Sequence, residues 1–352
     1  MATNSWQIEL ATIPLVSAHY VGNRNNGHEL ILSEKPLDTD DHRMNELLFT
    51  YFLGAFREPE MNHFTFSNDD FKLNPLYQFA CSVFDNKGDF HLQSVNIARH
   101  LFDVSNHPQI KSGDLFVAYI DGVIFNNKEC KAIGIFKSEN KQNFLKLYQE
   151  ANKFDLYYDA GINVDKLDKG CLIVDANREE GFQVCIVDRG NKGTEAQFWK
   201  DQFLQITPWA DEYHHTKEFL SLTKTYVTTQ FKEDFNINKT EEIDVLNRSM
   251  EYFKNHETFD KEEFVTEVFH EPEMIKSFHN FDTQYQETHN LEIEQSFEIS
   301  PSAVKKQQKV FKSILKLDKN FTIYIHGNRE QIQPGTDPDG KRFYKVYYNE
   351  EN

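Results

Sequence analysis

A run of lysines near the C-terminal end of the chain is spaced for contact with phosphate groups. The segment 300–320 begins with Ser300, a good N-cap, and Pro301, which suits the first helical position. At about 100° per residue, one set of lysines falls within roughly an 80° arc of the predicted helix. These lysines are Lys305, Lys309, Lys312, Lys316 and Lys319. Lysine is a flexible point charge that suits phosphate contact without base specificity. The alternative is a solvated helix face whose lysines meet the protein's own acidic surface.

A second candidate anion site is the turn from Arg189 to Lys192. Two glycines, Gly190 and Gly193, flank the turn's last residues and allow the backbone to approach a ligand closely. The helix predicted to begin at Thr194 would direct its first amide groups toward the same place. The alternative is a plain connection between a strand and a helix.

Two short strands precede this turn. Cys171–Val174 and Phe182–Val187 are separated by a polar loop that ends in Gly181, which is typical of a hairpin. Thr194 and Gln197 then form a capping box that opens an aromatic helix.

This order of two strands, a basic glycine turn and an aromatic helix resembles the bacterial nucleoid-associated protein family of the NdpA/YejK type. Arg189, Lys192 and Lys200 hold the positions nearest to the basic turn of that family. The resemblance implies a cytoplasmic, non-catalytic protein of the bacterial nucleoid. It further implies binding to DNA, either directly or through other chromosome-bound proteins.

The net charge limits how such a protein could meet DNA. The chain of 352 residues has 56 Asp and Glu against 38 Lys and Arg, a net charge of −18. Non-specific DNA binding comes from cations that displace phosphate counterions, so a globally acidic protein needs its basic residues gathered on one face. Any direct contact must therefore come from a local patch.

The sequence favours neither an enzyme nor a metal protein. His214-His215 lacks the spacing of the HExxH zinc motif, and GxSxG, P-loop and GxGxxG motifs are missing from the sequence. We therefore predict no cofactor and no metal site. The four cysteines include no CxxC, and we expect Cys171 and Cys185 to be buried free thiols. A metal-dependent nuclease or other hydrolase remains the least favoured alternative, because carboxylate sites can be assembled from distant positions.

The helices and strands expected around these residues indicate an α+β fold with a mostly antiparallel N-terminal sheet. Hydrophobic periodicity and turn residues divide the chain into an α+β domain over 1–206, a helical region over 207–290 and a C-terminal α+β segment over 291–352. The expected elements include a hairpin around 126–129, a short helix over 143–151, and a final strand pair formed by 321–326 and 342–348.

The favoured interpretation is therefore a nucleoid-associated protein that binds DNA non-specifically through a local basic face. The alternative is an acidic interaction module that docks on a chromosome-handling, DNA-bound protein. We expect no membrane span, since no stretch approaches 18 consecutive apolar residues. The sequence leaves open whether the chain forms homo-oligomers and whether it prefers DNA or RNA.

Overall fold

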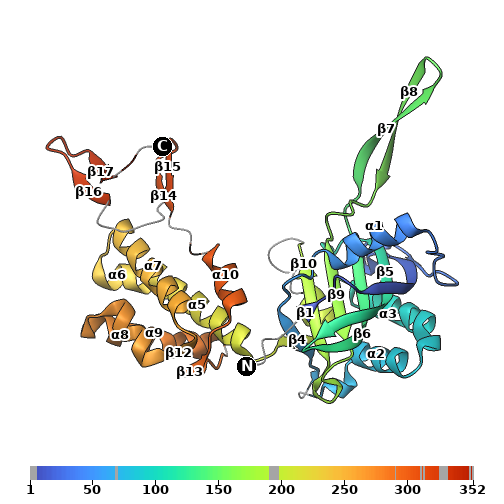
Figure 1. Ribbon diagram of the computed structural model, residues 1–352, viewed down its shortest axis with the longest axis horizontal. Helices are drawn as coiled ribbons and strands as arrows, with labels where there is room; N and C mark the ends of the chain where they lie inside the picture. The colour runs from blue at the N-terminus through green and yellow to red at the C-terminus, as the bar shows by residue number, and fades with distance from the viewer. Residues whose placement is uncertain are drawn as a thin grey trace. The chain divides into compact units, whose positions relative to one another are not determined.

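The computed structural model describes residues 6–67, 70–189, 198–289, 291–309, 311, 314–324, 332–348 and 350. The chain divides into two compact units, residues 1–209 and 210–352. Helices and antiparallel strand pairs occur in both, which confirms the α+β class predicted from the sequence (Figure 1).

The first unit is built on one antiparallel sheet. Its described strands run in the order β11-β4-β10-β9-β6-β5-β2-β3, and β1 pairs with β5. The strands are β1 (Trp6–Gln7), β2 (Thr12–Val21), β3 (Leu30–Ile31), β4 (Met61–Phe64), β5 (Gly113–Phe125), β6 (Lys128–Ser138), β9 (Lys169–Val174), β10 (Gln183–Asp188) and β11 (Ile206–Pro208).

Helices cover both faces of this sheet. They are α1 (His42–Leu53), α2 (Pro75–Asp85), α3 (Phe90–Val104) and a π-helical segment (Phe198–Leu204). The core on one face includes residues of α2, α3 and the π-helical segment, whereas the core on the other includes residues of α1. Successive residues of a strand alternate between the two faces. Accordingly, Cys171 lies in the first core and Cys185 in the second, and both are buried free thiols as predicted.

Local turn chemistry explains the two predicted hairpins, and both are confirmed. Between β5 and β6, Asn126 and Asn127 have φ angles of 50° and 60°. This is the left-handed pair of a two-residue hairpin turn, which asparagine adopts readily. Strands β9 and β10 pair residue for residue from Gln183 opposite Val174 to Asp188 opposite Lys169. The predicted helix cap at Thr194 lies outside the described residues.

One prediction in this unit is wrong. Residues 143–151 are not a helix, because Gln142–Glu150 forms strand β7 and pairs antiparallel with β8 (Lys153–Gly161). Figure 1 shows this hairpin projecting from the body of the first unit. Its apolar positions are spaced as on a helix, but pairing with the following strand overrides that pattern.

The second unit packs helices around an aromatic core. The helices are α5 (Glu212–Thr228), α6 (Gln230–Phe235), α7 (Lys239–Asn255), α8 (Lys261–Phe269), α9 (Pro272–His289) and α10 (Pro301–Gln308). Phe219, Tyr226 and Phe264 are fully buried among further aromatic rings of this core. The Asp260 carboxylate accepts the Glu263 N–H at 3.0 Å and caps the start of α8. Sequence reasoning missed helix α9. This helix begins at Pro272, shortly after α8 ends at Phe269.

Short strand pairs complete this unit. They are β12 (Thr258–Asp260) with β13 (Ser296–Glu298), β14 (Ile314–Leu317) with β15 (Phe321–Tyr324), and β16 (Ile332–Thr336) with β17 (Arg342–Val346). The predicted pairing of 321–326 with 342–348 is therefore wrong, because each segment has a nearer partner along the chain. Short loops cost less closure entropy than long ones, which favours these local pairings.

Candidate nucleic-acid interface

The C-terminal part of the second unit concentrates positive charge. Residues 301–348 contain ten Lys and Arg against four Asp and Glu, a net charge of +6 in a chain whose net charge is −18. The acidic excess therefore lies entirely in the rest of the protein. A local concentration of cations of this kind is what phosphate binding by an acidic protein requires.

Helix α10 carries the first group of these cations. Ala303 and Val304 are buried and anchor the helix, while Lys305, Lys306 and Lys309 are exposed near its C-terminal end. The Lys306 ammonium group lies 5.6 Å from the centre of the Tyr213 ring. Cations at the last turn of a helix also stabilise the helix through its macrodipole. This stabilisation gives the lysines a structural role beside any role in binding.

The predicted continuous lysine edge is wrong, because α10 ends at Gln308. Lys316 lies on strand β14 and Lys319 lies in the turn between β14 and β15, while Lys312 lies outside the described residues. Ile314 pairs with Tyr324 and Leu317 with Phe321, and the turn places Asp318 at a φ angle of 51°. Pairing across this turn excludes a helix over 314–317, so the lysines share a segment of chain but not one continuous helical face. The turn residues 318–320, followed by a β-prone run, were the signal that could have shown this.

The hairpin β16–β17 presents a surface that the sequence reasoning missed. Phe343 lies opposite Gly335 in the register, and its ring leaves no room for a Cβ atom there. The Lys345 ammonium group lies 4.8 Å from the centre of the Tyr347 ring, whose hydroxyl donates to Gln333 at 3.1 Å. We call Phe343, Lys345 and Tyr347 the β17 surface. All three side chains are exposed, so it combines a cation with aromatic rings as single-strand binding surfaces do.

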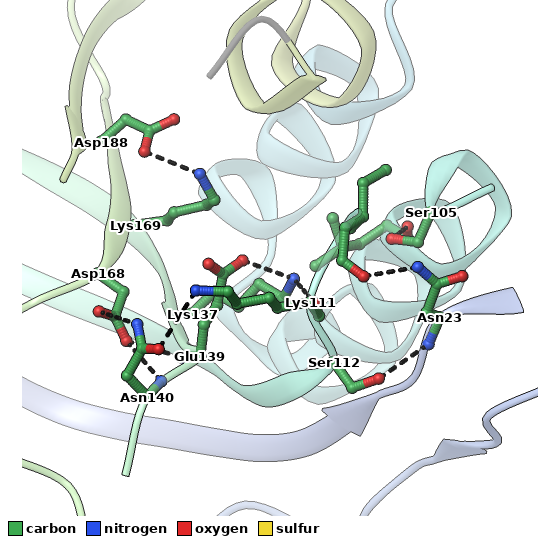
Figure 2. A network of polar contacts seen from close by, with 12 residues as sticks. Asn23, Ser105, Lys111, Ser112, Lys137, Glu139, Asn140, Asp168, Lys169 and Asp188 are labelled. Carbon is green, nitrogen blue, oxygen red and sulfur yellow. Dashed lines mark hydrogen bonds and ion pairs between the residues drawn. The ribbon is translucent and has the colours of Figure 1, made fainter. Parts of the chain in front are cut away.

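Arg189 belongs to the other unit and has a more acidic neighbourhood. It is exposed immediately after β10, and its backbone N–H donates to the Asp168 carbonyl at 2.9 Å. Beside it, Lys169 Nζ lies 2.8 Å from Asp188 Oδ1 (Figure 2). Lys192 lies outside the described residues. The structure therefore does not place Arg189 in one compact unit with the C-terminal lysines.

A buried polar network holds this end of the sheet. Lys137 Nζ donates to Glu139 Oε1 at 2.9 Å and to the Lys111 carbonyl at 2.5 Å (Figure 2). The Asp168 carboxylate accepts both backbone N–H groups that follow β6, those of Glu139 and Asn140, at 2.7 and 3.0 Å. Burial lowers the pKa of Lys137, and the Glu139 carboxylate opposes that shift. These contacts pair the buried charges with one another and hold the chain that leads from β6 into the β7–β8 hairpin.

Among the described residues, one group could supply three metal ligands. His256, Glu263 and Glu267 each place a ligand atom within 4.8 Å of the others. His256 Nδ1 lies 2.9 Å from the Tyr252 carbonyl, and Glu263 accepts the Tyr252 hydroxyl at 2.9 Å. These contacts account for both side chains as structural partners of Tyr252 near the start of α8.

The two adjacent histidines also have structural surroundings. His215 is buried, and its ring stacks on Phe297 with centroids 5.5 Å apart, whereas the backbone of His214 is capped by the Asp211 carboxylate at 2.9 Å. Their side chains belong to the packing around the start of α5. They offer no paired ligands of the kind that a zinc protease needs.

Comparison with known proteins places the whole arrangement in a family. No described helix is both long and apolar enough to cross a membrane. No curated protein matches the sequence. A family model described as nucleoid-associated protein YejK matches residues 17–348, which span both units and the basic C-terminal segment. The chain therefore belongs to the family of the nucleoid-associated protein YejK.

Proposed function

We propose that this protein binds DNA directly and without sequence specificity, through the basic C-terminal segment 301–348, and that it catalyses no reaction. The observation that carries the proposal is the segregation of charge: this segment has a net charge of +6, whereas the whole chain has −18. Membership of a nucleoid-associated family supports it, because such a protein works among DNA phosphates.

The lysines supply the phosphate contacts in this proposal. Lys305 and Lys309 lie at the end of α10 and Lys319 lies in the β14–β15 turn, all three exposed to solvent. Lys312 and Lys316 belong to the same segment. Lysine ammonium groups track the sugar–phosphate backbone and do not read base edges. The binding is therefore non-specific and falls steeply with salt.

The β17 surface adds a second mode of contact. Exposed rings next to an ammonium group can stack on unpaired bases while the cation meets the phosphates. Arg189 and Lys192 are secondary contributors in this proposal. Their contribution is smaller, because they lie outside the basic segment 301–348 and Arg189 directly follows an acidic residue, Asp188.

The test is fluorescence anisotropy of a labelled random-sequence duplex with the full chain at low and moderate salt. The triple variant Lys305→Glu, Lys309→Glu, Lys319→Glu should lose binding, and partial reversal should lower the slope of log K against log salt by about 0.9 per lost contact. The matched control reverses Lys35, Lys128 and Lys166, three exposed lysines of the first unit. It changes the net charge equally and should retain binding. Arg189→Glu should weaken binding only a few-fold.

Two results would contradict the proposal. Equal loss in the triple variant and in its control would mean that the C-terminal segment is no specific surface. If the wild type does not bind DNA at low salt, the protein must instead associate with the nucleoid through a DNA-bound partner. Incubation of plasmid with the protein and Mg²⁺, with and without a chelator, should leave the DNA intact in both cases if the protein is non-catalytic.

A further inference from the structure

The β7–β8 hairpin is an isolated arm. Gln142–Glu150 and Lys153–Gly161 pair only with each other among the described strands, through a two-residue turn at Ala151 and Asn152. All of its residues are exposed except the half-buried Gly161 at its base. A lone two-stranded hairpin is marginally stable in water unless something covers one of its faces. The side chains on the two faces of the arm show which face a partner would cover.

One face of the arm is satisfied by its own side chains. Lys146 Nζ lies 2.8 Å from Asp159 Oδ2 and 5.4 Å from the centre of the Phe144 ring. Tyr148 and Tyr157 meet edge to face on neighbouring strands, with centroids 6.4 Å apart. The Lys146 ammonium lowers the pKa of Asp159, in keeping with this pairing. We call this the polar face.

The opposite face is apolar and uncovered. The register places Leu145 opposite Tyr158, Leu147 opposite Leu156, and Gln149 opposite Phe154, and these side chains alternate with those of the polar face. The five apolar side chains among them are 59–80% exposed. We call Leu145, Leu147, Phe154, Leu156 and Tyr158 the apolar face. Its positions from 143 to 160 include no charged residue.

The size of the apolar face suits an interface between two copies. Large side chains carry on the order of 200 Å² each, so five of them at this exposure offer roughly 600 Å². Two copies packed on this face would bury roughly 1,200 Å², which reaches the lower end of specific protein interfaces.

The order of residues on the apolar face favours a second copy as the partner. Along β8 the face reads Tyr158, Leu156, Phe154, an aromatic–leucine–aromatic sequence that is the same in both directions. A two-fold axis perpendicular to the strands would place Leu156 of one copy on Leu156 of the other, and Leu147 of one copy on Leu147 of the other. Tyr158 of each copy would then meet Phe154 of the other. Such an isologous contact uses one self-complementary patch.

Charge favours the same antiparallel arrangement. Two chains of net charge −18 repel each other, so contact requires an uncharged patch that keeps the acidic bodies apart. Crossed antiparallel arms place the bodies at opposite ends of hairpins about 30 Å long. That separation is about four Debye lengths at physiological salt. Nucleic acid suits the arm less well, because 142–161 has two lysines against three acidic residues.

We propose that the β7–β8 hairpin is a self-association arm, through which two copies of this chain pack their apolar faces together in antiparallel fashion. The network around Lys137 and Asp168 holds the arm's base and so sets the direction in which it projects. This inference is independent of the proposed DNA binding.

The test is sedimentation velocity of the full chain at micromolar and higher concentrations. The wild type should sediment with about twice the 41.4 kDa mass of one chain. Leu156→Asp should be monomeric, with the dimer dissociation constant raised at least about a hundredfold, because two carboxylates meet at the two-fold axis. The matched control is Tyr157→Asp, which changes the neighbouring residue on the polar face, 57% exposed against 64% for Leu156. It should remain dimeric.

A mixing experiment identifies the partner as a second copy. Leu156→Lys should also be monomeric alone, but an equimolar mixture with Leu156→Asp should recover dimers, since opposite charges then meet at the axis. A wild type that stays monomeric at the highest concentration would overturn the proposal. So would equal dissociation of the Leu156→Asp and Tyr157→Asp variants. A monomeric wild type whose affinity for a single-stranded oligonucleotide disappears in Leu156→Asp would instead assign the arm to nucleic acid.

Discussion

Charged side chains in this protein occur in two different environments, as buried ion pairs and as exposed cations. Lys137 and Glu139 are almost completely buried as a pair, as are Lys261 and Asp282 in the second unit. Lysines of the C-terminal segment such as Lys305, Lys309 and Lys319 are exposed instead. A buried ammonium group is costly unless a partner satisfies it, whereas an exposed one is free to exchange counterions for phosphate. Residue type alone therefore does not identify the functional cations.

The buried pair gives a prediction about stability. Glu139→Gln leaves the Lys137 ammonium group without its counter-charge and should lower the free energy of unfolding of the first unit by about 3 kcal/mol. The double variant Lys137→Met, Glu139→Gln should recover most of the loss, because it removes the stranded charge. Urea unfolding followed by tryptophan fluorescence measures this, since Trp6, Trp199 and Trp209 all lie in the first unit.

The control for this prediction is a nearby exposed ion pair. Lys141 Nζ lies 3.0 Å from Asp114 Oδ2, with the lysine side chain 54% exposed. Lys141→Met should change the stability by less than about 1 kcal/mol. If Glu139→Gln is as mild as this control, the buried pair does not stabilise the sheet as described.

At the scale of elements, two of the proposed contact surfaces, the apolar face and the β17 surface, lie on hairpins. In β7–β8, one face is satisfied within the hairpin and the other is left apolar. In β16–β17, Ile332 is buried and pairs with Val346 of the opposite strand. Phe343 and Lys345 alternate with Val346 along β17, so they lie on the other face of the hairpin, and both are exposed. The period-two alternation of a strand thus separates an anchoring face from a binding face.

The β17 surface gives a prediction at this scale. Phe343→Leu keeps an apolar side chain over Gly335 but removes the aromatic ring. It should weaken binding of a labelled single-stranded oligonucleotide about tenfold, because stacking of one base contributes roughly 1–3 kcal/mol. Duplex affinity should change little, since paired bases are not available for stacking. Val346→Ala, which truncates an exposed side chain on the other face, is the control and should leave both affinities unchanged. Equal weakening of duplex and single-strand binding would show that the ring does not stack on bases.

At the scale of the whole molecule, the two units have separate cores. The two clusters that flank the sheet contain residues of the first unit only, and the helical cluster contains residues of the second only. Charge is divided along the chain as well, with the basic excess confined to the C-terminal segment of the second unit. A dimer formed through the arms of the first units would present two such segments to DNA.

Separate cores predict separate unfolding. Circular dichroism, which reports on helices of both units, should show two transitions on heating, whereas tryptophan fluorescence should follow only the one that belongs to the first unit. Glu139→Gln should shift that transition and leave the other in place. A single transition with coincident curves from both probes would mean that the two units unfold cooperatively.

Sequence patterns predicted those features that depend on residues close together in the chain. The apolar spacing of α3, the Asp260 cap of α8, the Asn126-Asn127 turn and the β9–β10 hairpin could all be predicted, because backbone angles and contacts within a few residues decide them. The net charge, the family resemblance and the cluster of lysines also came from the sequence. The sequence did not show that those lysines are divided among α10, β14 and a turn.

The tertiary structure decided the features that depend on a distant or competing partner. Residues 142–150 and 314–317 have periodicities compatible with a helix, yet each becomes a strand because a neighbouring strand satisfies its backbone hydrogen bonds. The β17 surface and the apolar face of the arm likewise exist only through strand register, which places residues from two strands side by side. The sequence by itself determined the charge balance and the local turns and caps. Only the fold decided which side chains meet, because that depends on strand pairing and on which faces are buried.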